Sequence, residues 1–207
     1  MKLLTSLSHI LSFLYPYKLH QKLQSKRDAL YTLWIRNFLG HVGEHSRICR
    51  PCSLEGGGQK NIAIGDYTTI HGFSILGCWV KYGEQEFPEA SITIGDHCSI
   101  GEHNQITACN KITIGNGLLT GRYVIISDNA HGGLSEEASI APLRRKLKSK
   151  GEVVIGNNVW LGDKVSVLAG VHIGNNVIVA ANAVVTKDIP DNCIAAGVPA
   201  RVVKRIE

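Results

Sequence analysis

The chain has 207 residues, of which 44% are hydrophobic and 19% charged, which excludes a disordered or collagen-like protein and leaves room for one folded domain with a small appendage. Its formal net charge of +5 lies in the first 40 residues, which hold six basic residues and one acid, whereas residues 41–207 hold sixteen of each. A body without excess charge argues against nucleic acid as the partner.

The first 42 residues are predicted to form an amphipathic helical segment. They are rich in leucine, a good helix former, and Leu3, Leu7, Ile10 and Leu14 recur at helical spacing. Pro16 is expected to end that helix or to begin a second one. Two roles for residues 1–40 stay open: a helical cap packed on the body or on a neighbouring subunit, and a basic amphipathic anchor on an anionic membrane surface.

The six cysteines fit a reducing compartment. Only Cys49 and Cys52 have the spacing of a metal or redox pair, and no second Cys or His pair accompanies them. We therefore expect reduced thiols, either packed or solvated, and no metal. The spacing is not that of a small secreted scaffold, so we expect a cytoplasmic protein, which the anchor role would hold at the inner face of the membrane.

A six-residue repeat dominates the rest of the chain. Each unit begins with an aliphatic residue and continues with Gly, Asn or Asp, which tolerate the positive φ of a tight corner. Stacked units of a short strand and a corner form a solenoid whose aliphatic residues point inward. The sequence therefore predicts a mainly β protein, a parallel β-helix over residues 43–207. The repeat is carried by Ile64 and Ile70, by Ile94, Ile100 and Ile106, by Ile114, Thr120 and Ile126, and by Ile155, Leu161, Val167, Ile173, Val179 and Val185.

With these repeats the chain resembles the hexapeptide-repeat acyltransferases, and most closely the branch that contains maltose, galactoside and polysaccharide O-acetyltransferases. The likeness covers about residues 60–205. It implies a left-handed β-helix, a homotrimer with sites between subunits, and transfer of an acetyl group from acetyl-CoA to a hydroxyl of a sugar or polysaccharide precursor.

The repeat breaks twice. Residues 76–91 are out of phase and predict a looped-out or irregular coil, and residues 132–151 predict a long excursion loop. Insertions in a solenoid leave as loops from one face, often the binding face. The second loop carries five basic residues between Arg144 and Lys150, which form either a solvated tip or an attraction for an anionic substrate or the phosphates of coenzyme A.

His131 is the candidate catalytic base. It falls at an outward position at the base of the excursion loop, before the segment Ile155–Trp160, where the resemblance implies a catalytic histidine. An imidazole can take the proton of an acceptor hydroxyl as that hydroxyl attacks a thioester, in direct transfer through a ternary complex. Asp128 either orients His131 or caps a turn, and Glu136 or Glu137 could orient it instead.

The resemblance also implies a coenzyme A groove. Trp160 matches the tryptophan near the thioester end, and the tail 197–207 has the family's ending. For Ala181 and Thr186 ordinary repeat packing explains the residues as well. The matched positions along the pantetheine arm, the adenine and the phosphates are Ala180, Ala181, Thr186, Lys187, Arg201 and Lys204.

The acceptor is the least determined part. By register, Glu102 or Asn104 stands where the resemblance implies a contact with the acceptor. The sequence does not decide whether the acceptor is a hydroxyl or an amine, or whether the donor carries an acetyl or a longer acyl group. Alternatives are a serine acetyltransferase-like enzyme, an amino-sugar N-acetyltransferase, a γ-class carbonic anhydrase and a non-catalytic solenoid. The anhydrase needs three histidines on zinc, yet His97 and His103 are one repeat apart and should lie on different faces.

Overall fold

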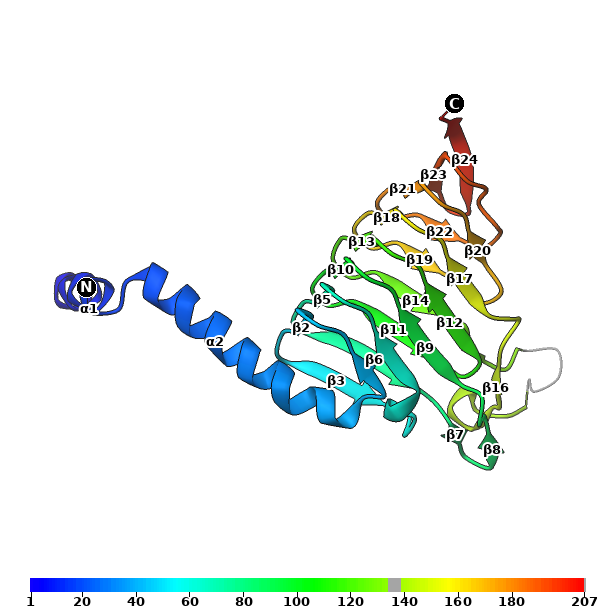
Figure 1. Cartoon of the computed structure of the whole chain (residues 1–207), viewed down its shortest axis with the longest axis horizontal. Coiled ribbons are helices and arrows are strands. Elements are labelled where there is room, and N and C mark those ends of the chain that lie inside the picture. The colour runs from blue at the N-terminus through cyan, green and yellow to red at the C-terminus, as the bar shows by residue number, and fades with distance from the viewer. Residues whose placement is uncertain (134–138, 207) are drawn as a thin grey trace.

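The computed structural model describes residues 1–133 and 139–206, and its body is a parallel β-helix with three faces. Each coil contributes one short strand to each of three parallel sheets, so the coils stack from β2 and β3 at the helical end to β24 at the C-terminal end (Figure 1). The pairing of His41 with Ala63 and of Val42 with Ile64 begins the first face. The mainly β fold class is confirmed.

The three faces are built from strands in the following orders. The first face consists of β1 (His41–Val42), β4 (Ile62–Ile64), β9 (Ser91–Ile94), β12 (Lys111–Ile114), β17 (Val153–Ile155) and β20 (His172–Ile173). The second consists of β2 (Arg47–Ile48), β5 (Thr69–Ile70), β10 (Ser99–Ile100), β13 (Leu119–Thr120), β18 (Trp160–Leu161), β21 (Ile178–Val179), β23 (Cys193–Gly197) and the antiparallel β24 (Ala200–Arg205). The third consists of β3 (Cys52–Glu55), β6 (Ser74–Cys78), β11 (Gln105–Ala108), β14 (Ile125–Ser127), β19 (Ser166–Val167) and β22 (Val184–Val185).

The predicted six-residue rhythm is the core of the β-helix. Every residue that the repeat placed inward, from Ile64 to Val185, is at most 5% exposed. At the corner between the first and second faces, Asn158 and Asn176 both have a φ of 55°, and the side chain of Asn158 donates to that of Asn176 at 3.3 Å. A Cβ atom on Gly115 would lie 2.7 Å from Oδ1 of Asn157 in the next coil, so the corner requires glycine there.

The N-terminal segment consists of two helices, α1 (Lys2–Leu14) and α2 (Tyr17–Ile35), with Pro16 between them as predicted. The end of α2 and the short helix η1 (Arg36–Phe38) cover the first coil: the Thr32 hydroxyl accepts the Ile48 N–H at 3.0 Å, and the Tyr31 hydroxyl accepts the Cys52 N–H at 3.1 Å. The other half of α2, and all of α1, extend away from the β-helix (Figure 1). No helix among the described residues is long and apolar enough to cross a membrane.

Both excursions leave the corner between the third and first faces, two coils apart. The first begins later than expected, because Leu76–Cys78 lies in the regular strand β6, and it forms a hairpin of β7 (Lys81–Tyr82) and β8 (Gln85–Glu86). The second runs from β14 to β17 and holds β15 (Ala130–His131), the short helix η3 (Pro142–Arg144) and β16 (Leu147–Lys148). A further short helix, η2 (Gln59–Asn61), precedes β4.

Candidate functional site

His131 lies in β15, where the chain leaves the third face. β15 pairs in antiparallel fashion with β16, and the Gly132 N–H donates to the Lys146 carbonyl at 2.8 Å, so the base of the excursion loop is a small ribbon rather than open coil. The imidazole is exposed and meets the Tyr82 ring edge-to-face, with 5.5 Å between ring centroids and 65° between planes. An exposed, partly supported imidazole can exchange protons with a bound acceptor.

The two excursions are joined to each other beside His131. The Tyr82 hydroxyl donates to the Leu143 carbonyl at 2.8 Å. The side-chain amide of Gln85 accepts the Leu147 N–H at 2.8 Å and donates to the Leu147 carbonyl at 3.2 Å. Sequence reasoning named neither Tyr82 nor Gln85 as a site residue. The sequence indicates these two residues only indirectly, because both breaks of the repeat fall at the same corner of the solenoid.

Asp128 caps the neighbouring coil. Its carboxylate is 0% exposed and accepts the backbone N–H groups of Cys109 and Asn110 at 2.8 and 2.9 Å. Burial raises the pKa of this carboxyl, while the hydrogen bonds from Cys109, Asn129 and Asn110 oppose that rise. No hydrogen bond among the described residues joins it to His131. Of the two roles expected for Asp128, these contacts are those of the turn cap. Glu136 and Glu137 lie outside the described residues.

The two candidate acceptor residues lie at a different corner, between the second and third faces. Asn104 is 2% exposed; its amide nitrogen donates to Thr120 and to the Gly121 carbonyl, and its oxygen accepts the Val124 N–H at 2.7 Å. Its polar atoms are therefore used inside the β-helix, and we correct the expectation that it touches an acceptor. Glu102 forms a 3.2 Å ion pair with Arg122, and both residues line a cavity of about 440 Å³.

The candidate cofactor residues lie at several different places on the prism. Trp160 is half exposed on the second face between Leu119 and Ile178, and the corner that follows β21 carries Ala180 and Ala181. Thr186 and Lys187 are exposed at the corner after β22, on the edge of His131 and two coils further along.

The remaining cations have different surroundings. Arg201 and Lys204 are exposed on β24, paired with β23. Within the basic run, Arg145 donates to the carbonyls of Ile140 and Gly132 at 2.8 and 3.3 Å. These two hydrogen bonds stabilise the excursion loop. The Arg144 side chain, by contrast, is exposed.

The cysteines form no disulfide among the described residues, and no group of three His, Cys, Asp or Glu side chains there is placed to hold a metal ion. Burial raises the pKa of Cys52 to about 12, which makes its thiolate scarce at neutral pH. His97 stacks on Tyr67 and His103 on Phe73, at separate corners, as the spacing of the two histidines predicted.

Comparisons with known proteins agree with this architecture. The family model described as bacterial transferase hexapeptide (six repeats) matches residues 152–187. The candidate lipopolysaccharide biosynthesis O-acetyltransferase WbbJ of Escherichia coli K12 is 46% identical over 87 residues, which are 40% of this chain and 44% of that protein. The galactoside O-acetyltransferase of the same strain is 47% identical over 70 residues, or 31% and 34% of the two chains.

The chain thus covers less than half the length of these two curated relatives. Among solved structures, the N-acyltransferase AntD of Bacillus cereus, in complex with dTDP and 3-hydroxybutyryl-CoA, superposes with a TM-score of 0.67 over 84% of this chain and 87% of that one. At 22% identity this match concerns the fold alone. The six-residue repeat and the three-faced β-helix agree with these matches, and residues 152–187 are similar to the bacterial hexapeptide-repeat transferases.

Proposed function

We propose that the protein is an acetyl-CoA-dependent O-acetyltransferase that acts on a hydroxyl of a sugar or polysaccharide precursor. The observation that carries the proposal is His131, which is exposed at the base of the excursion loop and supported by Tyr82 from the other excursion. The names of the two curated relatives, a candidate lipopolysaccharide enzyme and a galactoside enzyme, support a sugar hydroxyl as the acceptor.

His131 acts as the general base in this mechanism. Its neutral imidazole takes the proton of the acceptor hydroxyl while the hydroxyl oxygen attacks the thioester carbonyl. As the C–S bond breaks, the imidazolium returns that proton to the departing sulfur of coenzyme A, so the proton count balances. Acetyl transfer is direct, and no serine or cysteine needs to become acylated.

The arrangement of one chain supports a site shared between subunits. His131 and Trp160 lie on different parts of the prism, and no contact between them is found among the described residues. We therefore propose a homotrimer in which the groove for coenzyme A runs between two copies. Trp160, Ala180 and Ala181 would line it from one copy, and His131 would reach it from the other. Glu102 remains a candidate acceptor contact across that boundary.

Substitution of His131 tests the function. We expect His131→Ala to lower the release of coenzyme A from acetyl-CoA by about 10²–10⁴-fold, the usual contribution of a general base. The acceptors to assay are sugars, nucleotide sugars and amino acids, which also separate a hydroxyl from an amine acceptor.

The matched control is His172→Ala, which removes an exposed imidazole from the first face without touching the excursions. Circular dichroism and native mass should be the same for both variants. Turnover of His131→Ala at the level of His172→Ala would overturn the assignment of the base.

A further inference from the structure

The N-terminal helix α1 presents an apolar stripe that the β-helix does not cover. Five aliphatic side chains recur at spacings of three and four, which places them on one side of the helix. They are 52–70% exposed, and Figure 1 shows α1 held away from the body. A contiguous apolar surface of this kind marks an interaction site. The stripe consists of Leu4, Leu7, Ile10, Leu11 and Leu14.

The exposed charges of α2, the helix that follows this stripe, have one sign. Residues 1–40 carry six basic side chains, and their one acid, Asp28, is 7% exposed. Asp28 already accepts the Arg50 N–H at 3.3 Å and lies 3.6 Å from the Arg50 guanidinium. Among the described side chains of α2, every exposed charged group is therefore positive. The basic residues are Lys2, Lys18, Lys22, Lys26, Arg27 and Arg36.

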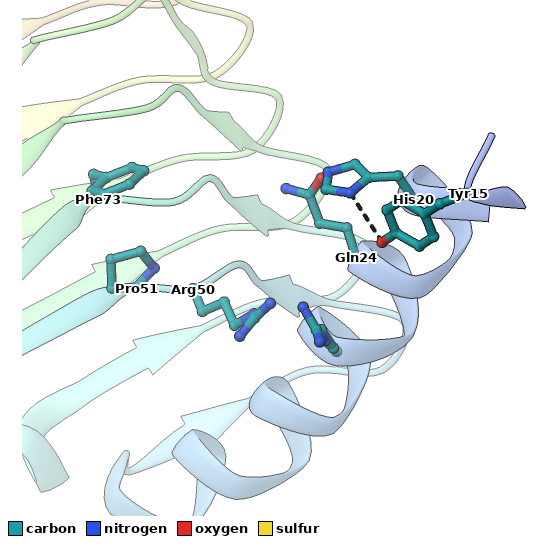
Figure 2. Close-up of a pocket in the computed structure, with 7 residues that line it drawn as sticks. Tyr15, His20, Gln24, Arg50, Pro51 and Phe73 are labelled. Carbon is teal, nitrogen blue, oxygen red and sulfur yellow. Dashed lines mark hydrogen bonds between the residues drawn. The ribbon is translucent and has the colours of Figure 1, made fainter. Parts of the chain in front are cut away.

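The gap between α2 and the body adds to this positive surface. A cavity of about 400 Å³ opens there, and Figure 2 shows His20 and Gln24 of α2 on one side and Arg50, Pro51 and Phe73 of the corner on the other. Arg27 also lines the cavity, and its guanidinium takes part in none of the side-chain hydrogen bonds or ion pairs found among the described residues. A guanidinium that has no such partner among the described residues is available to an external anion.

We propose that residues 1–35 dock the protein on an anionic lipid bilayer, with the apolar stripe of α1 in the interface and the cations toward lipid phosphates. A basic amphipathic helix gains from both apolar burial and attraction to anionic headgroups. A second copy of the same surface is the alternative occupant, but two surfaces that expose only positive charge repel each other. The proposal does not depend on the acetyl-transfer reaction.

Vesicle flotation tests the docking surface. The full-length protein is expected to float with phosphatidylcholine vesicles that contain phosphatidylglycerol, to bind pure phosphatidylcholine at least tenfold more weakly, and to detach as salt rises. Leu11→Glu should weaken binding about tenfold or more, because it removes an aliphatic side chain from the stripe. His9→Glu is the matched control, since it changes the charge by the same amount on the opposite side of α1.

A second pair of variants separates local charge from net charge. Reversing Lys18 and Lys22 to Glu should weaken binding at least about tenfold, because each cation near an anionic surface contributes about fivefold. Reversing Lys81 and Lys164, which are exposed on the body, makes the same change in net charge and should leave binding nearly unchanged. Equal binding to both kinds of vesicle, or equal effects of Leu11→Glu and His9→Glu, would overturn the proposal. So would a stripe variant that lowers the native mass and leaves flotation intact, because the stripe would then join two copies.

Discussion

The carboxylate of Asp128 lies close in sequence to a catalytic candidate, yet its hydrogen bonds to the backbone are those of a local cap. It follows β14 and precedes His131 by three positions, yet both of its oxygens accept hydrogen bonds from the backbone of the coil beneath. A buried carboxylate that satisfies two N–H groups holds a corner together, and removing it leaves those donors unpaired.

We predict that Asp128→Asn lowers the free energy of unfolding by about 1–3 kcal/mol, because the amide can accept one N–H but turns its own donor toward the other. Urea denaturation measures this loss, and the pH profile of the residual kcat should match that of the parent protein. A shifted pH profile with unchanged stability would mean instead that Asp128 acts through His131.

At the scale of elements, the excursion that carries His131 is hydrogen-bonded to a hairpin more than fifty residues earlier in the chain. The Gln85 amide forms two hydrogen bonds with the backbone of Leu147, and the Leu147 side chain is only 6% exposed. Leu147 also pairs with His131 in the ribbon of β15 and β16. Gln85 therefore supports the strand opposite the candidate base, without touching that base itself.

We predict that Gln85→Ala increases the exchange rate of the Leu147 amide hydrogen and lowers kcat about tenfold with little change in circular dichroism, because the strand opposite His131 loses its two hydrogen bonds to Gln85. Glu86→Ala, in the same hairpin, is the control, since the Glu86 side chain is exposed. Unchanged amide exchange in Gln85→Ala would show that β15 and β16 hold their position alone.

The sequence predicted the regular elements well and the contacts between excursions poorly. Ile64, Ile155 and their equivalents lie inward because a repeating pattern of apolar residues determines which side of each strand is buried. Tyr82 and Leu143 meet across 61 residues through one hydrogen bond, which leaves no periodic signal. The burial of Asn104 has a related cause: the repeat pattern does not show whether a polar side chain between two strands turns inward, as this one does.

At the scale of the whole molecule, the second face exposes large apolar side chains of the kind that an assembly would cover. Leu119 and Trp160 are adjacent on the second face and are 48% and 49% exposed, whereas His131 lies on the opposite edge of the same coils. Exposed large apolar side chains in a row indicate a contact surface. A single chain with this geometry holds the parts of the proposed site without bringing them together.

Mixed oligomers provide the test of a site shared between subunits. In this test, His131→Ala and Trp160→Glu subunits are co-expressed under different tags, and only oligomers that carry both tags are purified. We predict that about one active site in three is restored in these oligomers. A cyclic trimer built from the two types has one interface in which both native residues are present. Each variant alone should be inactive. The control pairs His131→Ala with the double variant His131→Ala and Trp160→Glu, in which no interface is intact and activity must stay absent. If the doubly tagged trimer forms but is as inactive as this control, His131 and Trp160 do not act together across the boundary, and the groove would have to be built within one chain.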